Sequence, residues 1–368
     1  MNKNNLRFFI TLLMLMFFCG IIQAETLKVL TQNIWGVPDS VSTRLSAPKM
    51  LERKEQFCNS LRSMEQAPDI VLIQELWNNE DAVYMIKNCG YSYYSYQDKA
   101  GLGTILNSNN QKLTSHFFET IKNEINDKLR YFGINIDALI KYAICWSYEL
   151  GVCNLLEDIG VIPNRTDLLQ ATNWFKDSYV KSGLLILSKY PIESQYRMIY
   201  SDRGDLEKIL SDLERSVTKS LMLVKVTISG HPLWVANTHL IANYEYKPNE
   251  GDYYSKQRSS QFAEALSFIK KIVGNEPVVF GGDFNMGETY PCWDFLREEL
   301  KSSDIEWDVD NNPTYDGRYN GYAKSNEGKL DHILGMNGVK AKQEGLAFVE
   351  NPVSDHYGVY KILEIPRY

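Results

Sequence analysis

The chain has 368 residues, of which 44% are hydrophobic and 23% charged, a composition that supports a buried core and excludes an intrinsically disordered protein. Its formal net charge of -7 weighs against a nucleic-acid partner, because proteins that bind a phosphate backbone normally present a surface rich in lysine and arginine. The length fits either two domains or one large sandwich with an inserted segment, and we expect residues 25–368 to form a single domain.

Residues 1–24 have the features of a secretory signal peptide. Lys3 and Arg7 precede an apolar run over residues 8–18, and Ala24 then leads into a polar stretch. The run is shorter than the ~20 residues that a membrane-spanning helix needs. We therefore expect cleavage after Ala24 and a secreted or periplasmic location.

Removal of this leader leaves an odd number of cysteines. They are Cys58, Cys89, Cys145, Cys153 and Cys292, and their spacing indicates neither a metal site nor a disulfide framework. Cys145 and Cys153 could pair with each other or could be small core residues. The sequence does not imply that the fold depends on disulfides.

The first segment after the leader predicts a strand, since residues 27–36 alternate apolar and polar side chains before a Gly-Val-Pro turn. Asn33 falls near the end of that strand. A helix is expected at about 49–64, and residues 69–77 then predict a buried apolar strand that ends at the carboxylate of Glu75. Asn33 and Glu75 are thus expected at the edge of a sheet.

From about 107 to 179 the pattern changes to that of a helical insertion. Apolar residues recur every four positions from Leu113 to Leu129, which is typical of an amphipathic helix. The stretch 136–159 is apolar almost all round and includes Trp146. The insertion either packs on the rest of the domain as a hairpin or dips into a lipid interface, where Trp146 would contact the substrate.

Strands resume after the insertion, at 182–188, 220–228, 232–237, 277–280, 331–334 and 358–363, with a helix at 257–272. One of these strands leads into Gly281–Asn285, which places Asp283 and Asn285 on the same side of an extended chain. The glycines allow a ligand to approach the backbone closely, although an Asx turn after a strand gives the same pattern. Strand ends that carry polar residues favour a layered sandwich with a site along one edge.

Three of the five histidines also lie at predicted strand ends. His239 ends an apolar strand just after Asn237 and Thr238, His332 follows Asp331, and His356 follows Asp355. Histidine exchanges a proton near neutral pH, and a neighbouring carboxylate, for which Asp331 is the candidate, can fix its tautomer. Together with carboxylate and amide oxygens suited to Mg²⁺, these residues could serve the hydrolysis of a phosphodiester, which needs a metal, a base and donors to the transition state.

The order of these motifs resembles the endonuclease/exonuclease/phosphatase superfamily over most of residues 27–363, apart from the insertion. The motif residues are Asn33, Glu75, His239, Asp283, Asn285, Asp331 and Ser354–His356. The resemblance implies an α/β fold, a four-layered sandwich of two facing, mostly antiparallel sheets flanked by helices. It also implies a magnesium-dependent phosphodiesterase.

The resemblance further implies the roles of the metal ligands. Glu75 would be the principal magnesium ligand with Asn33 beside it, and manganese or another divalent cation could take the place of magnesium. Asp355 would complete the catalytic site, next to a second metal if one binds.

For the remaining catalytic residues, the resemblance makes His356 the general base, held by Asp331. Asp283 and Asn285 would orient the attacking water and the phosphate, and His239 would stabilise charge on the phosphorane. Either His356 or Asp283 could take the proton, and we favour His356.

The choice of substrate rests on residues between the motifs, because superfamily members act on nucleic acids, inositol phosphates or sphingomyelin. Segments 30–36, 238–244 and 252–261 resemble animal-type neutral sphingomyelinases, whereas inositol-phosphatase signatures are missing. The resemblance implies hydrolysis of sphingomyelin to ceramide and phosphocholine at a membrane surface, with Asn243 and Tyr244 as substrate-binding residues. It implies no nucleic-acid partner and no obligate protein partner.

Two departures from the family pattern keep alternatives open. His332 stands where the family usually has tyrosine, and Met286–Glu288 replaces a basic residue after the Asp-x-Asn motif. The alternatives are a secreted metal-dependent nuclease, a phospholipase C-type enzyme acting on another phospholipid, and an inactive family member that only binds membranes. The intact motif residues argue against the inactive protein.

Overall fold

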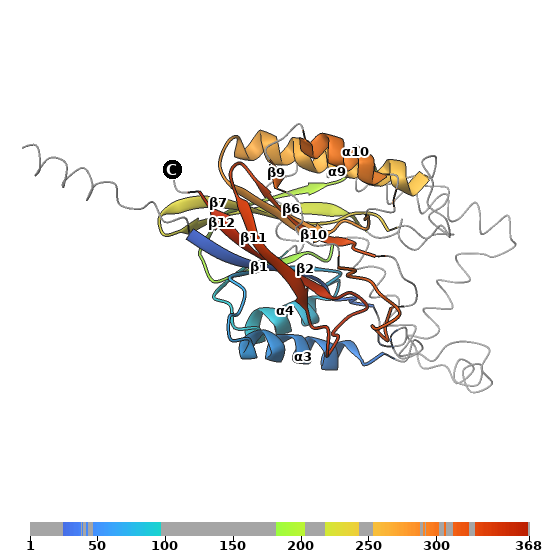
Figure 1. The fold of residues 1–368 in the computed structure, drawn as a ribbon. Helices are drawn as coiled ribbons and strands as arrows, with labels where there is room; N and C mark the ends of the chain where they lie inside the picture. The colour runs from blue at the N-terminus through green and yellow to red at the C-terminus, as the bar shows by residue number, and fades with distance from the viewer. Residues whose placement is uncertain are drawn as a thin grey trace, which may run out of the picture.

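The computed structural model is a sandwich of two six-stranded sheets with helices on both outer faces (Figure 1). The structure describes residues 25–37, 39, 42, 47–96, 182–202, 218–242, 253–287, 290, 292–301, 305–306, 312–323 and 328–366. The expected leader, 1–24, and the expected insertion, 107–179, lie outside the described residues and stay predictions.

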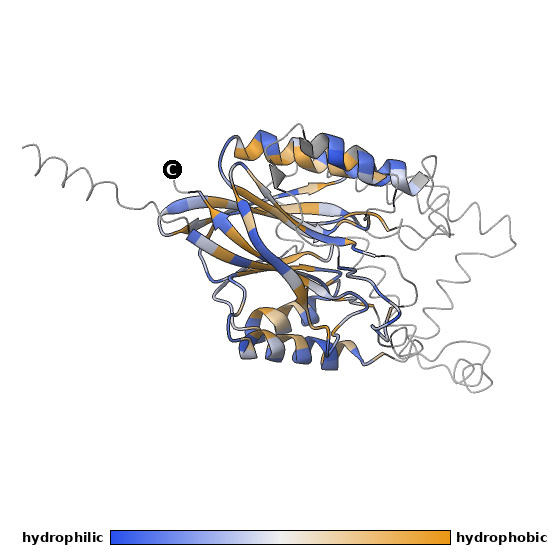
Figure 2. Ribbon diagram, viewed as in Figure 1, coloured by the Kyte–Doolittle hydropathy of each residue, from blue (hydrophilic) through white to orange (hydrophobic). Residues whose placement is uncertain are grey.

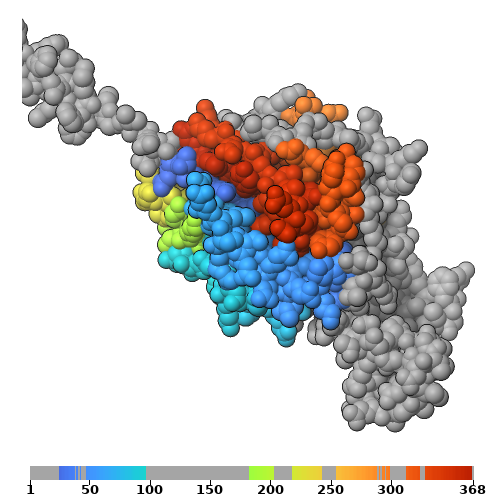
Figure 3. Space-filling model, turned by 60° about the horizontal axis from the view of Figure 1, so that its bottom comes forward, coloured from blue at the N-terminus to red at the C-terminus, as the bar shows by residue number. Residues whose placement is uncertain are grey.

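The first sheet has the strand order β11-β12-β1-β2-β4-β3. Its strands are β1 (Glu25–Asn33), β2 (Ile70–Gln74), β3 (Tyr93–Tyr96), β4 (Leu185–Ser188), β11 (Lys340–Ala347) and β12 (Gly358–Ile365). The pair β1 and β2 is parallel, and the other neighbours are antiparallel. Because β1 pairs with β12, early and late parts of the chain lie side by side, as the blue and red surfaces in Figure 3 show.

The second sheet has the order β5-β6-β7-β8-β10-β9. Its strands are β5 (Ile192–Ile199), β6 (Ser220–Ile228), β7 (His231–His239), β8 (Val278–Asp283), β9 (Ile305–Glu306) and β10 (Asp331–Met336). Here β7 and β8 are parallel, and the other neighbours are antiparallel. Each sheet therefore contains one parallel pair among antiparallel strands.

The two parallel pairs are built in the same way. Helix α3 (Met50–Ser63) lies between β1 and β2 in the sequence, and helix α9 (Tyr253–Val273) lies between β7 and β8. Such crossovers are how neighbouring parallel strands are joined. Since parallel strands run in the same direction, the carboxyl ends of each pair lie at one edge of its sheet, which is where the predicted site residues fall.

Three apolar clusters separate the four layers and confirm the expected sandwich. Leu72 and Val235 lie in the cluster between the sheets, Phe262 and Phe280 in the cluster under α9 and α10 (Cys292–Lys301), and Phe57 in the cluster under α3 and α4 (Asn79–Asn88). Figure 2 shows that the helices turn hydrophobic residues toward the sheets and hydrophilic residues outward. Burial of these apolar faces is the main stabilising force of the fold.

A disulfide joins Cys58 of α3 to Cys89 at the end of α4. The spacing of these cysteines did not predict the pair, because they are separated by 31 positions and only the packing of the two helices brings them together. Cys292 is a buried free thiol, and the alternative pair of Cys145 and Cys153 lies outside the described residues. Within the described ranges, none of the helices is long and apolar enough to cross a membrane.

Candidate active site

The carboxyl ends of the two parallel strand pairs face each other across the sandwich. Asn33 ends β1 and Glu75 directly follows β2, while His239 and Asp283 end β7 and β8 and lie opposite each other in the parallel ladder. Four of the predicted residues are thus delivered by four strand ends, two from each sheet.

Asn33 connects the two halves of this site. Its Nδ2 donates to Glu75 Oε1 at 3.0 Å and to Asp283 Oδ2 at 2.9 Å, while its Oδ1 accepts a hydrogen bond from the backbone N–H of Trp35 at 2.9 Å. Glu75 has a φ of 59°, so the chain turns sharply where it leaves β2. A Cβ on Gly36 would lie 2.0 Å from the carbonyl oxygen of Glu75, which explains why glycine follows Trp35.

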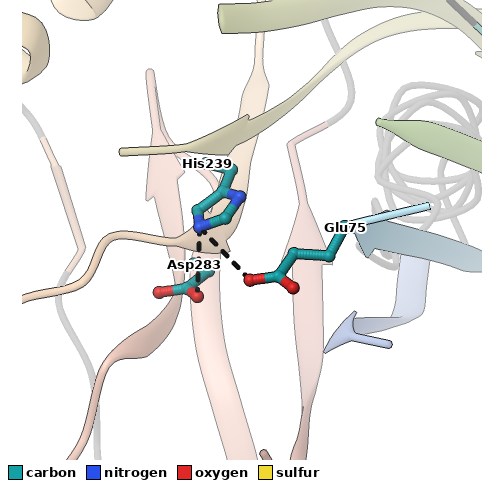
Figure 4. A group of neighbouring side chains, drawn as sticks. All are labelled: Glu75, His239 and Asp283. Carbon is teal, nitrogen blue, oxygen red and sulfur yellow. Dashed lines mark ion pairs between the residues drawn. The ribbon is translucent and has the colours of Figure 1, made fainter. Parts of the chain in front are cut away.

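Glu75, His239 and Asp283 point toward one another (Figure 4). His239 Nε2 lies 3.6 Å from Asp283 Oδ2 and 3.9 Å from Glu75 Oε1, and the three side chains each offer an atom within 4.8 Å of the others. Two carboxylates beside an amide supply the hard oxygen donors that magnesium prefers. The residues therefore fit a divalent cation.

His356 and Asp331 form a second group with Asp283. His356 Nδ1 lies 2.8 Å from Asp331 Oδ2, and His356 Nε2 lies 3.9 Å from Asp283 Oδ2. Thr314 Oγ1 fixes the backbone beside this carboxylate by accepting hydrogen bonds from the N–H groups of Leu330 and Asp331, at 2.9 and 3.2 Å. This arrangement leaves Nε2 of His356 directed toward Asp283.

The charges in the two groups change how the acids and bases titrate. Burial lowers the pKa of His356, but the carboxylates of Asp331 and Asp283 outweigh burial and leave the pKa well above its usual value. Burial and the neighbouring Asp331 raise the pKa of Asp283 to about 6, against the opposing effects of His356 and Asn33. Without a bound cation, the carboxyl group of Asp283 therefore takes up a proton at about pH 6.

The sequence matches the endonuclease/exonuclease/phosphatase family over residues 30–356, which is most of the chain and includes both groups of site residues. The chain belongs to this family. Its motif residues therefore occupy positions that the family fold brings to one edge of the sandwich.

Two relatives show what the family likeness covers. A putative neutral sphingomyelinase from Drosophila melanogaster is 27% identical over 155 residues, which are 41% of this chain and 34% of the fly protein. A 5'-tyrosyl-DNA phosphodiesterase from Caenorhabditis elegans is 23% identical over 198 residues, which are 46% of this chain and 52% of the worm protein. The matched segments span about a third to a half of these two proteins.

Among solved structures, a variant of beta toxin from Staphylococcus aureus with bound magnesium ions has the same fold. The TM-score is 0.56 at 16% identity, and the match covers 93% of this chain and 100% of the toxin chain. The arrangement of the two sheets in this chain is therefore similar to that in the toxin, in agreement with the family assignment.

The remaining family motif residues hold different positions. The N–H of Asn285 donates to Asp283 Oδ1 at 2.8 Å, and its Nδ2 donates to the carbonyl of Leu240 at 2.9 Å. The two alternatives for this segment, an Asx turn and a part of the site, are therefore compatible. Asn285 forms the turn and thereby shapes the loop around Asp283. Asp355 accepts from Ser354 Oγ at 3.0 Å, and burial raises the pKa of Asp355.

His332 faces away from the site. Its Nε2 lies 2.8 Å from the carbonyl oxygen of Met286, and its ring packs against Phe284 and Trp293 in the core under α10. Because side chains alternate along β10, Asp331 points into the site and His332 points to the opposite face. Asn243, Tyr244 and Trp146, the predicted substrate-binding residues, lie outside the described residues.

Lys219 is a site residue that the sequence analysis missed. Its Nζ lies 2.9 Å from His239 Nε2, and the side chain is buried. Burial, followed by the positive charge of Lys219, holds the pKa of His239 well below its usual range. The available signal was strand pairing, since the neighbouring Ser220 lies opposite His239 in the ladder of β6 and β7.

Proposed function

We propose that the chain is a secreted, magnesium-dependent phosphodiesterase that hydrolyses sphingomyelin to ceramide and phosphocholine. The observation that carries this proposal is the meeting of Glu75, Asp283, His239 and His356 at facing strand ends, within a few ångströms of one another. This set supplies cation ligands, a base and donors at one place, which is what hydrolysis of a phosphodiester requires.

Glu75 and Asp283 would hold the cation, with Asn33 beside them. When bound there, magnesium would neutralise phosphate charge and make water more acidic. The hydrogen bonds from Asn33 Nδ2 to both carboxylates hold the two oxygens close together before any cation arrives. The closeness of the buried Asp283 and the partly buried Glu75 carboxylates is costly on its own and is offset when a cation binds.

His356 would take the proton from the attacking water at Nε2. Its Nδ1–H donates to Asp331, which orients the ring and stabilises the imidazolium that forms. Its raised pKa makes the neutral imidazole of His356 a strong base. A cation bound at Asp283 would favour this neutral imidazole over the imidazolium. Asp283 is the alternative base.

His239 and Lys219 would stabilise negative charge on the phosphoryl oxygens. The lowered pKa of His239 keeps the imidazole neutral near pH 7, mainly because of burial. A neutral imidazole can donate one hydrogen bond, while the nearby ammonium of Lys219 supplies positive charge. Buried donors of this kind act most strongly where charge develops in the transition state.

The sphingomyelin substrate is supported by the likeness to the fly protein and by the motif segments around His239. The likeness to the worm phosphodiesterase favours a nuclease as the second candidate. The net charge of -7 weighs against the nuclease, because its substrate is a polyanion. A phospholipase C-type activity on another phospholipid is a variant of the first candidate.

Export is supported by two independent features. The leader at residues 1–24 has the order of charges and apolar residues of a signal peptide, and the disulfide between Cys58 and Cys89 is of the kind that persists in oxidising compartments. We expect the mature protein to begin at Glu25. N-terminal sequencing of exported protein checks this, and a retained leader would contradict it.

The deciding experiment measures the products of the purified mature protein on three substrates. These are liposomes of sphingomyelin, liposomes of phosphatidylcholine, and a single-stranded DNA that carries a 5'-tyrosyl group. We expect phosphocholine release from sphingomyelin that stops on chelation and returns with magnesium. Turnover of the DNA alone would replace the proposal by the nuclease, and turnover of phosphatidylcholine alone would replace the substrate.

A further inference from the structure

Two buried amides lie directly behind the cation ligands. Gln74 is the last residue of β2 and immediately precedes Glu75, and Asn237 lies on β7 two residues before His239. Both side chains are completely buried, at 0% exposure. The two strands belong to different sheets, so this pair lies at the junction between the halves of the site.

The amides form a chain of hydrogen bonds from one sheet to the other. Gln74 Nε2 donates to Asn237 Oδ1 at 2.7 Å and to Thr31 Oγ1 at 3.0 Å. Asn237 Nδ2 in turn donates to the backbone carbonyls of Ile73 and Leu185, at 2.9 and 3.1 Å. Asn237 of the second sheet is therefore bonded to both β2 and β4 of the first sheet.

The position of these bonds is specific. Ile73 and Leu185 face each other as the last pair of the ladder between β2 and β4, just before the chain turns at Glu75. Asn237 thus bonds to β2 at the last pair of its ladder with β4, while the ladder of β2 with β1 continues to Gln74, opposite Asn33. Glu75 is the second residue beyond that pair.

Stability alone does not explain the pair. It lies among apolar residues of the inter-sheet core such as Leu72 and Val235, and buried polar groups there cost free energy unless they are fully bonded. Gln74 Oε1 has no hydrogen-bond partner in the part of the chain that the structure describes. An apolar pair of similar volume would fill the space without this cost, but it would not supply the fixed hydrogen-bond geometry between the two sheets.

We propose that Gln74 and Asn237 are positioning residues that form a latch between the two sheets and thereby set the affinity of the site for its divalent cation. The latch fixes Glu75 of the first sheet relative to His239 and Asp283 of the second. Neither amide touches the cation. The inference rests on the proposed function only in that the site binds a divalent cation.

The test compares variants of the full mature chain by their affinity for manganese and magnesium, measured by calorimetry without substrate. Asn237→Leu and Gln74→Met remove the bonds across the sheets while keeping side-chain volume. We expect about tenfold weaker cation binding in each, the size of effect found for residues that orient metal ligands. Turnover at saturating magnesium should recover most of the wild-type value, because every group that contacts the substrate remains.

The matched control is Ser95→Ala. Ser95 of β3 donates to Gln195 of β5 at 2.8 Å, which is another hydrogen bond between the sheets, but at the edge strands rather than behind the cation ligands. This variant should lose stability without losing cation affinity. Equal loss of affinity in the control would show that any inter-sheet bond has the same effect, which would overturn the latch.

If Asn237→Leu and Gln74→Met do not fold, Thr31→Val provides the milder test, because it removes only one acceptor of Gln74 Nε2. The proposal would be refuted if a folded Asn237→Leu or Gln74→Met variant bound the cation as tightly as the wild type. If neither of these folds, the same result for Thr31→Val would refute it. A wild-type protein that binds neither manganese nor magnesium would refute the proposed function instead. The two failures are therefore distinguishable.

Discussion

The surroundings push the pKa values of the two histidines of the site in opposite directions. His356 faces the carboxylates of Asp331 and Asp283, and its pKa is raised despite burial. His239 is buried beside Lys219, and its pKa is lowered. Neighbouring groups with pKa values pushed apart are what an acid–base mechanism needs, since one group can hold a proton that the other cannot.

The roles assigned to Glu75 and His356 predict different defects. Glu75→Gln removes a carboxylate that would bind the cation, so turnover should fall to background and calorimetric magnesium binding should be lost. His356→Ala should leave magnesium binding largely intact while lowering kcat by about 100- to 10,000-fold, the usual contribution of an acid–base group. The role of base would instead belong to Asp283 if two results were found together. The His356→Ala variant would have to be active, and the Asp283→Asn variant would have to be inactive while still binding magnesium.

The raised pKa of Asp283 predicts how cation binding depends on pH. Only the ionised carboxylate is a good ligand, and the pKa of Asp283 is about 6 rather than near 4. Below pH 6 protons should compete, and the apparent magnesium affinity should fall by about tenfold per pH unit. Titrations between pH 5 and 8 in buffers of different ionisation heat would also detect proton release on binding. Affinity that stays constant down to pH 5 would contradict the shift.

The sequence indicated the residues of the site better than it indicated the side chains that surround them. Asn33, Glu75, His239 and Asp283 could be found because each ends or follows a recognisable apolar strand. Lys219 could not, because a single lysine before a strand is indistinguishable from a solvent-exposed charge until the pairing of β6 with β7 is known. The orientation of His332 toward the core likewise depends on which face of β10 is covered.

The elements themselves were predictable where they are apolar and buried. Strands β2 and β8 and helices α3 and α9 appear within a few residues of the expected positions, because their patterns have a clear period or run. Strands β3 and β11 were not predicted, since Tyr93–Tyr96 and Lys340–Ala347 are polar and partly exposed edge strands. Their place in the sheet comes from pairing with β4 and β12, which no local pattern encodes.

The link between α3 and α4 gives a prediction about stability. Replacing both Cys58 and Cys89 by alanine should lower the free energy of unfolding by about 3 kcal/mol, because the crosslink restricts the unfolded chain. Urea unfolding measures this difference. Cys292→Ala is the control variant, since Cys292 is buried but unpaired. The wild-type protein should show the same decrease in the free energy of unfolding as the double variant only when a reductant is added. Equal stability of the double variant and wild type would contradict a stabilising role.

The described part of the chain consists of two sheets of similar construction, each contributing one parallel strand pair to a shared edge. This arrangement explains why motif residues as distant in sequence as Asn33 and Asp283 are directly hydrogen bonded. The strand pattern alone suggested a layered sandwich with a site along one edge, and the facing of the two sheets came from the family resemblance, because packing between the sheets is not encoded in any local pattern. The site exists only where both halves are present.

The net charge of -7, which loss of Lys3 and Arg7 with the leader would make more negative, leads to a prediction about the target membrane. An acidic protein should be repelled by an anionic surface at low ionic strength, and the repulsion should be largely screened near ~0.15 M salt. We therefore expect phosphatidylserine in sphingomyelin liposomes to slow hydrolysis in low salt and to matter little at ~0.15 M, whereas hydrolysis of zwitterionic liposomes should change little with salt. A soluble phosphodiester substrate separates membrane association from catalysis. If anionic lipid instead accelerates hydrolysis at low salt, a local basic surface rather than the net charge governs the approach to the membrane.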